Sequence, residues 1–218
     1  MIITIDGPAA AGKGTLSSKL AQKYNLAYFD TGMIYRAVGL DLILNNIDPE
    51  DDEKALFSAK NMTFSKMMEL SKHADFRSNL GGQAASKVAA KTPVRQALLK
   101  MQQDFALNPQ FADGSKAKGV VYDGRDTGTV VCPNAEIKIF ITASPEIRAM
   151  RRHKEFVEKG IDSDYNEVLA QTKERDLRDS SRASAPLKPA DDAIIIDTSD
   201  MSIEDVYNNV CKIIDSKK

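Results

Sequence analysis

The strongest chemical signal in the sequence is a glycine-rich run near its start, which ends in a lysine and a threonine. The run reads Gly7-Pro8-Ala9-Ala10-Ala11-Gly12-Lys13-Gly14-Thr15. Glycines let backbone N–H groups converge on phosphate oxygens, and a lysine adds a point charge for the terminal phosphates of a nucleotide. We therefore predict that the whole run binds the phosphates of ATP, that Lys13 is catalytic and that the Thr15 hydroxyl holds Mg²⁺.

Gly14 departs from the commonest form of this phosphate-loop motif, because many such proteins have a hydroxyl residue there and this chain has it at Thr15. The Gly-Lys-Gly-Thr form resembles nucleoside monophosphate kinases more than GTPases or motor ATPases. A glycine-rich turn with an incidental lysine is the alternative. The flanking residues favour the phosphate loop, because a strand-like run precedes it and a helical pattern with Leu16 and Leu20 follows it.

Arginines recur in three other segments, and a second phosphate would need such bases. They stand in Asp30-Thr31-Gly32-Met33-Ile34-Tyr35-Arg36, in Asp123-Gly124-Arg125-Asp126, and at positions 175, 178 and 182. An acceptor phosphate carries roughly −1.5 to −2 charges near neutral pH, so it approaches ATP only where bases neutralise both. A small-molecule kinase needs this second site, whereas a GTPase needs to orient water. Asp123 follows an apolar run, and its carboxylate is a candidate ligand of Mg²⁺.

The three arginines at 175, 178 and 182 have the spacing i, i+3 and i+7, which places them on one helical face. A salt-bridged surface helix explains the same spacing. Three acid–base pairs have ion-pair spacing there: Glu174 with Arg178, Arg175 with Asp179, and Asp179 with Arg182. Residues 180–189 favour a functional role for these arginines over a salt-bridged surface helix. A helix that ends in Arg-Ala-Ser-Ala-Pro before a strand is more typical of a movable lid than of a packing element.

Short, continuous apolar runs predict the strands that position these residues. They span residues 2–5, 26–29, 120–122, 137–141 and 194–196. Continuous rather than alternating apolar character indicates strands buried on both faces of a parallel sheet. We predict an α/β fold, a three-layer α/β/α P-loop core with a five-stranded parallel sheet. Helices are predicted to start at Ser144-Pro145-Glu146 and at the capping-box pattern Ser202-Ile203-Glu204-Asp205.

Residues from about 40 to 115 show helical patterns, and we interpret them as an insertion between two strands of the core. Within it, residues 62–77 fit either a short strand pair or a helix, and the pattern leaves this choice open. A chain of 218 residues suits one domain, 1–218, and about 150–187 is its predicted lid region.

Composition and charge exclude several classes of protein. With 42% hydrophobic and 28% charged residues, the chain is typical of globular proteins. Its 30 Lys and Arg nearly cancel its 31 Asp and Glu, so we expect neither nucleic acid nor a membrane as a partner, and we expect a monomer. The start has neither the flank nor the length of a signal peptide or membrane span, which predicts a cytoplasmic location. We expect Cys132 and Cys211 to be reduced, and His73 and His153 to lie at the surface.

The sequence resembles the bacterial cytidylate kinases in five ordered segments: GPAAAGKGT, FDTGMIYRAV, AASKVAA with VRQALLKMQ, YDGRDTGTVVCPNAEIKIFITAS, and KERDLRDSSRASAPL. The resemblance spans Ile2 to Leu187 and is weakest in the helical middle. It implies a P-loop core of parallel strands, an enlarged monophosphate-binding insertion at about 40–115 and a short lid. It also implies transfer of the ATP γ-phosphate to CMP or dCMP.

The resemblance implies roles for individual residues. Contacts to the acceptor phosphate are implied for Thr31, Arg36, Arg125 and Arg182. Recognition of cytosine is implied for Ser86, Arg95 and Asp126, and contacts to the sugar hydroxyls for Arg175, Asp179 and Ser86. Arg151 is implied on the ATP side, and the predicted catalytic set is Lys13, Arg125, Arg151 and Arg182. For Ser86 and Arg95, a surface helix explains the sequence equally well.

Residues 62–82 depart from the family pattern, because the strand hairpin of the insertion is shortened and Leu80-Gly81 replaces an acid followed by an apolar residue. A kinase for UMP, AMP or shikimate is therefore the nearest alternative, and a nucleotide-binding switch is a second one. Asp-Thr-Gly triplets at Asp30 and Asp126 suggest an aspartic protease with a pair of catalytic carboxylates as a further alternative. Such a site needs a β-rich chain, whereas both triplets here precede helical patterns or polar loops.

Overall fold

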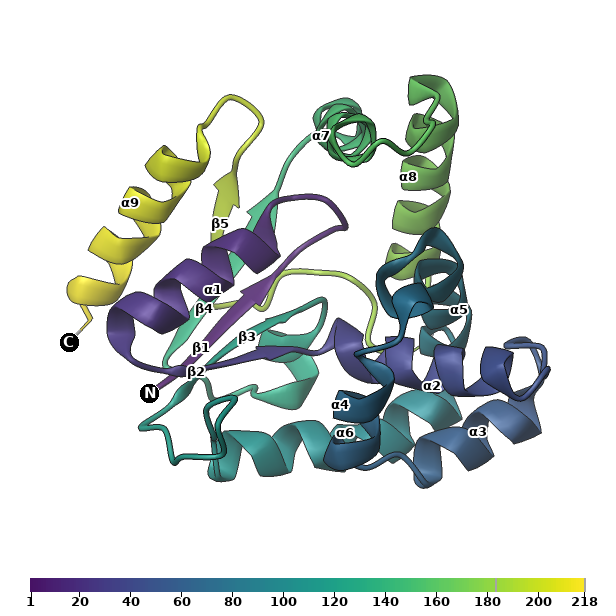
Figure 1. The fold of residues 1–218 in the computed structure, drawn as a ribbon. Coiled ribbons are helices and arrows are strands. Elements are labelled where there is room, and N and C mark those ends of the chain that lie inside the picture. The colour runs from purple at the N-terminus through teal and green to yellow at the C-terminus, as the bar shows by residue number, and fades with distance from the viewer. Residues whose placement is uncertain (183, 218) are drawn as a thin grey trace. The chain divides into compact units, whose positions relative to one another are not determined.

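The computed structural model describes residues 1–182 and 184–217. The chain folds as two compact units, and Figure 1 shows their elements. The first unit comprises Met1–Phe29 and Pro109–Lys218, and the second comprises Asp30–Asn108. The helical unit thus begins and ends earlier in the chain than the predicted insertion at about 40–115.

The first unit is built on a five-stranded sheet with the order β2-β3-β1-β4-β5. The strands are β1 (Ile2–Asp6), β2 (Ala27–Asp30), β3 (Val120–Gly124), β4 (Ile137–Thr142) and β5 (Ile194–Asp197). β1 pairs in parallel with β3 and β4, and β4 pairs in parallel with β5. All five predicted strands and the α/β fold class are confirmed, and the sheet is not that of an aspartic protease.

Two helices cover one face of this sheet, α1 (Lys13–Tyr24) and α9 (Ile203–Asp215), and they lie side by side (Figure 1). Ile3 and Ile5 of β1 are fully buried and belong to the same core cluster as residues of both helices. The predicted capping box starts α9, because the Ser202 hydroxyl accepts from the Asp205 N–H at 3.1 Å and the Asp205 carboxylate accepts from Ser202.

The opposite face carries the alternate residues of β1, and these are also buried. Thr4 is 0% and Asp6 is 6% exposed. The turn η2 (Thr127–Val131) contacts β1 and follows β3 closely in the chain. Burial on both faces explains the continuous apolar runs of β1, β3 and β4, whereas the edge strands β2 and β5 expose Tyr28 and Ile195.

Two further helices pack against each other in this unit, α7 (Pro145–Glu158) and α8 (Tyr165–Ser180). The predicted start of α7 is confirmed, since the Ser144 hydroxyl accepts from the Ile147 N–H at 3.3 Å. Because α8 ends at Ser180, Arg182 lies beyond the helix. The prediction that it shares a helical face with Arg175 is therefore wrong.

The second unit is helical. Its elements are α2 (Gly32–Leu44), α3 (Asp52–Lys60), α4 (Phe64–Leu70), the short 3-10 helix η1 (Ala74–Arg77), α5 (Asn79–Ala89) and α6 (Thr92–Leu107). α2 packs closely on α5, because a Cβ added at Gly39 would lie 2.8 Å from the Cβ of Ala84. The choice left open for residues 62–77 is decided in favour of helix.

Candidate active site

The phosphate loop begins where β1 ends, and Gly7 is required there by both conformation and space. Its φ is +149°, and an added Cβ would lie 1.9 Å from the carbonyl oxygen of Ile141. The loop leads directly into α1 at Lys13, so the first N–H groups of that helix face the loop. These groups and the positive end of the helix dipole favour a bound anion.

Lys13 is buried under the loop, with 6% of its side chain exposed. Its Nζ donates to the carbonyl oxygen of Pro8 at 2.8 Å and lies 4.0 Å from Oδ1 of Asp123. Burial, together with the nearby guanidiniums of Arg125 and Arg175, lowers the pKa of Lys13 to about 7, against the opposing effect of the Asp123 carboxylate. A phosphate placed beside this ammonium would stabilise its charged form.

Asp123, at the end of β3, lies against the start of α1. A Cβ added at Gly14 would be 3.3 Å from its Oδ2, and the Tyr28 hydroxyl donates to the same oxygen at 3.4 Å. Gly14 therefore faces the carboxylate, whereas Thr15 is exposed and lines a cavity on the loop. One carboxylate beside a phosphate site fits Mg²⁺, which takes one or two protein carboxylates and completes its shell with phosphates and water. Asp123 fits this role better than Thr15.

A buried carboxylate, Asp179 of α8, gathers three arginines. Nε of Arg125 donates to Oδ2 of Asp179 at 3.1 Å, and Nε of Arg175 lies 4.0 Å from the same oxygen. Nη2 of Arg182 donates to Oδ1. Only 2% of the Asp179 side chain is exposed, against 19% for Arg125 and 6% for Arg182. The predicted residues from the loop after β3 and from α8 thus meet at one point.

This arginine cluster, defined as Arg125, Arg175, Arg182 and Asp179, has more positive than negative charge. Burial alone would raise the pKa of Asp179, but the guanidiniums of Arg125, Arg182 and Arg175 outweigh burial and hold that pKa below its ordinary value. The carboxylate is ionised at neutral pH and offsets one of three positive charges. The remaining charge suits a phosphate dianion.

Arg178 does not belong to the cluster. Its Nη2 donates to Glu174 one helical turn away, and both side chains lie at the surface. The salt-bridged-helix interpretation is therefore correct for Arg178, whereas Arg175 and Arg182 turn towards Asp179.

Arg151 of α7 lines a cavity beside the phosphate loop. Its Nη1 donates to Oγ1 of Thr198 at 3.2 Å and its Nη2 donates to the carbonyl oxygen of Thr198 at 2.6 Å. It lines a cavity of about 330 Å³ together with loop residues and the start of α9. The other lining residues include Ala10, Ala11, Gly12, Thr15, Met201 and Val206. The volume is within the usual range for sites that bind small molecules.

The second unit holds the remaining predicted residues. Arg36 of α2 donates through Nη1 to the carbonyl oxygen of Phe76 at 3.0 Å, and Thr31 is buried just before the same helix. Ser86 of α5 and Arg95 of α6 are 5% and 7% exposed, so the surface-helix alternative for them is wrong. The Arg95 guanidinium lies over the Tyr35 ring, 5.2 Å from its centroid. Packing fixes the position of both side chains, but their role stays a prediction.

Asp6 is a buried carboxylate that the motif analysis missed. Its Oδ1 accepts from the N–H and the hydroxyl of Thr127 at 2.9 and 2.8 Å, and its Oδ2 accepts from the Gly128 N–H at 2.7 Å. Burial raises the pKa of Asp6, and the bonds from Gly128 and Thr127 oppose that rise. Asp6 fixes the turn after Arg125 and Asp126 against the start of the phosphate loop. An acid ending an apolar strand was the available signal.

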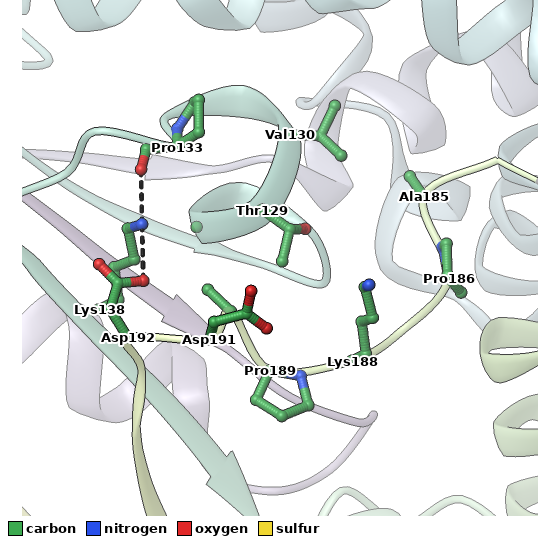
Figure 2. A pocket seen from close by; sticks show the side chains of 12 residues that line it. Thr129, Val130, Pro133, Lys138, Ala185, Pro186, Lys188, Pro189, Asp191 and Asp192 are labelled. Carbon is green, nitrogen blue, oxygen red and sulfur yellow. Dashed lines mark hydrogen bonds and ion pairs between the residues drawn. The ribbon is translucent and has the colours of Figure 1, made fainter.

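A second cavity, of about 360 Å³, lies between η2 and residues 185–192 (Figure 2). Lys138 of β4 lines it, and its Nζ donates to the carbonyl oxygen of Pro133 at 2.5 Å and to Oδ1 of Asp192 at 2.8 Å. These bonds fasten the segment that returns from α8 to β5.

The two cysteines and the two histidines of the chain differ in burial. Cys132 and Cys211 are buried free thiols, and burial raises the pKa of Cys132 to about 11. His153, predicted at the surface, is half-buried, with Nδ1 3.0 Å from Oγ of Ser163, whereas His73 is exposed.

Within residues 1–182 and 184–217, the helices lack the combination of length and apolar character that is needed to cross a membrane. Nor does the described part of the chain contain a cluster of three or more metal-ligating His, Cys, Asp or Glu side chains.

Comparison with known proteins identifies the family. The family model described as cytidylate kinase matches residues 3–216. A cytidylate kinase of Paramagnetospirillum magneticum is 48% identical over 100% of this chain and 99% of its own length, and one of Rhodospirillum rubrum is 46% identical over 100% and 98%. A shikimate kinase from Bacteroides thetaiotaomicron has a similar fold, with a TM-score of 0.50 and 12% identity over 99% of this chain and 97% of that one. The phosphate loop, the arginine cluster and this full-length similarity agree that the chain belongs to the cytidylate kinase family of phosphotransferases.

Proposed function

We propose that the protein transfers the γ-phosphate of ATP to CMP, and also to dCMP, to give ADP and the corresponding diphosphate. The observation that carries the proposal is the arginine cluster, because its charge exceeds what Asp179 neutralises and Arg125 and Arg175 act on the pKa of Lys13. The two proposed phosphate sites would therefore lie close together in the first unit. The names of full-length relatives favour CMP as the acceptor.

The donor half of the site is the phosphate loop with its adjoining cavity. The N–H groups of the loop and Lys13 would hold the phosphates of ATP. The cavity of about 330 Å³ would take the nucleoside, with Arg151 at its edge. Asp123 would hold Mg²⁺ or its water shell, and the ion supplies neutralisation of charge on the phosphate oxygens when it is bound.

The family resemblance assigns residues to the acceptor half of the proposed site. Arg125 and Arg182, with Arg36 and Thr31, would hold the acceptor phosphate. The proposed readers of the cytosine are Ser86, Arg95 and Asp126, and the proposed contacts of the sugar are Arg175, Asp179 and Ser86. Buried polar groups that pair with a base reject an analogue that leaves them unpaired, so the burial of Ser86 and Arg95 supports a specificity role.

In the proposed reaction, an oxygen of the acceptor phosphate attacks the γ-phosphorus of ATP directly and in line. The bond between the γ-phosphorus and the oxygen that bridges it to the β-phosphate breaks, and ADP leaves. Lys13, Arg125, Arg151 and Arg182 would stabilise the charge on the transferring group. Residues 150–187 would act as a lid that excludes water. We further propose that the enzyme is a cytoplasmic monomer that uses neither nucleic acid nor a membrane.

A coupled assay of ADP release tests this function. The purified protein is given MgATP and one of CMP, dCMP, UMP, AMP or shikimate, with a reaction lacking acceptor as the control. We expect release to require an acceptor and to be fastest with CMP. Release that is independent of any acceptor would indicate a nucleotide-hydrolysing switch, and a best rate with AMP would overturn the CMP assignment.

A further inference from the structure

Arg148 of α7 is a buried arginine that lies outside the arginine cluster and has a different set of partners. Only 2% of it is exposed. Its Nε donates to the carbonyl oxygen of Ala143 at 2.8 Å, and its Nη1 donates to the carbonyl oxygen of Ala9 at 3.3 Å. Ala143 directly follows β4, and Ala9 is inside the phosphate loop. One guanidinium therefore joins the carboxyl end of β4 to the phosphate loop.

The same guanidinium also binds α8. Its Nη1 donates to Oδ1 of Asp176 at 2.9 Å, and its Nη2 donates to Oδ2. A bidentate pair of this kind fixes direction as well as distance, because the guanidinium and the carboxylate are both planar. Asp176 thereby sets the position of α8 relative to the phosphate loop.

Asp176 stands three residues before Asp179, so the two carboxylates are neighbours on the same side of α8. Asp179 in turn positions Arg125 and Arg182. A chain of hydrogen bonds and neighbouring carboxylates therefore runs from the Ala9 carbonyl, through Arg148 and Asp176, to the residues that we propose hold the acceptor phosphate.

The charge of this pair differs from that of the arginine cluster. Arg148 and Asp176 carry one charge each, and the guanidinium donates to four oxygen atoms within the protein. The pair is thus electrically balanced and leaves no surplus for a phosphate. Its chemistry is that of a fixed connection rather than of a ligand for substrate.

We propose that Arg148 and Asp176 are positioning residues that couple the donor site at the phosphate loop to the acceptor site on α8, so that ATP at the loop favours the arrangement that binds the acceptor phosphate. This inference rests on the proposed function. Coupling between two sites is a free energy that both ligands share, so it is measured as a ratio of dissociation constants.

A matched control lies on the same two helices. Glu146 of α7 and Lys173 of α8 form an ion pair at 3.0 Å, and their side chains are 53% and 55% exposed. This pair also joins α7 to α8, but it does so at the surface. Lys173→Met therefore removes a bridge between the helices without disturbing the guanidinium that contacts Ala9.

The experiment measures the Kd of CMP with and without a non-hydrolysable ATP analogue and Mg²⁺, for the wild type, Arg148→Lys, Asp176→Asn, Asp176→Glu and Lys173→Met. We expect the wild-type ratio of the two Kd values to be on the order of 10, and to fall towards 1 in Arg148→Lys and Asp176→Asn. The kcat of these two variants should fall roughly 10- to 100-fold, because small displacements of reacting groups have effects of that size. Lys173→Met should keep the wild-type ratio and kcat, and Asp176→Glu should recover part of both.

Thermal melting of each variant separates positioning from folding. If Arg148→Lys and Asp176→Asn melt early but retain the wild-type ratio of Kd values, their role is structural and the inference is wrong. A wild-type ratio of 1 would also overturn it, because no coupling would exist. Failure of the wild type to release ADP with CMP would instead refute the proposed function, together with the inference that rests on it.

Discussion

Two neighbouring carboxylates on α8 differ in the number of arginines that they bind. Asp176 binds one, Arg148, through both of its oxygens. Asp179 is shared by three, Arg125, Arg175 and Arg182. The first group is electrically balanced, and the second has a surplus of positive charge in a site where little side-chain surface is exposed.

The difference separates a structural use of arginine from a binding one. A balanced, bidentate pair is satisfied before any ligand arrives, so it can hold backbone segments in place. Guanidiniums that outnumber their carboxylate repel one another, and a phosphate dianion relieves that repulsion. The surplus, rather than the presence of arginine, is therefore our reason for proposing an anion site at Asp179 and not at Asp176.

The largest effect should follow from removing a positive charge, either Lys13 of the phosphate loop or Arg182 of the arginine cluster. In Lys13→Ala and Arg182→Ala we expect kcat to fall by roughly 10³- to 10⁵-fold, because such groups stabilise charge on the transferring phosphoryl group. The fold should persist, since each substitution also removes like-charge repulsion. The measurement is ADP release with CMP, alongside circular dichroism. Near-normal turnover in Lys13→Ala would show that Lys13 is not catalytic, and near-normal turnover in Arg182→Ala would show that Arg182 is not.

Asp179→Asn tests the opposite change, because it leaves three guanidiniums without their counter-charge. Loss of one partner from a buried ion pair typically lowers the free energy of unfolding by about 3–5 kcal/mol. The folded pKa of Asp179 lies below its ordinary value, so its contribution is present above about pH 4, the unfolded value, and is lost as pH falls through the folded pKa.

Urea unfolding of the wild type and Asp179→Asn at several pH values measures this contribution. The two proteins should differ most near neutral pH and converge in acid. Added inorganic phosphate should stabilise the variant more than the wild type, since it supplies the missing negative charge. Equal stability of both proteins at neutral pH would mean that the three arginines do not need Asp179.

The sequence predicted the parts of the site that depend on local pattern. The glycine run before a helix, the five strands and the Ser144 and Ser202 caps each follow from neighbouring residues, and the structure confirms them. The arginine positions were visible as well. Helical spacing gave equal weight to Arg175, Arg178 and Arg182, because it describes one helix and not what packs against it.

The partners of these arginines depend on tertiary packing and were not predictable. Arg148 stood in an ordinary helical segment, and its acceptors Ala9 and Asp176 are 139 and 28 residues away. Asp6 was passed over for the same reason, because Thr127 is 121 residues away. Residues 62–77 lacked a turn signal, and only packing decided between helix and strand.

The pKa of Lys13 gives a further test of the comparison, because Arg125 and Arg175 of the arginine cluster lower it. Burial, Arg125 and Arg175 lower its pKa to about 7 in the ligand-free protein, so most of it is neutral at pH 8. Bound phosphates should raise that pKa by about 2 units, equivalent to roughly 2.7 kcal/mol. ATP binding at pH 8 should therefore take up close to one proton, and binding at pH 6 should take up almost none at this site.

Calorimetry of ATP binding at pH 8 in buffers of different ionisation enthalpy measures the uptake. Lys13→Met is the matched control and should take up no proton at this position. Because the folded pKa is lower than the unfolded one, charged Lys13 destabilises the ligand-free protein at and below pH 7, and this penalty disappears as pH rises towards 10. Lys13→Met should thus be more stable than the wild type at pH 6 and equal to it near pH 10.

The smallest effect should come from Arg178, which the sequence pattern placed with the other two arginines of α8. It pairs with Glu174 at the surface, where an i, i+4 ion pair contributes about 0.3–0.5 kcal/mol. Arg178→Ala should therefore leave the kcat and the KM for CMP unchanged and, through loss of this ion pair, lower the free energy of unfolding by about this amount. Glu174→Gln should behave alike, because it breaks the same pair from the other side. A loss of turnover in Arg178→Ala but not in Glu174→Gln would show that Arg178 joins the acceptor site during turnover, and that the charge surplus is larger than the ligand-free structure indicates.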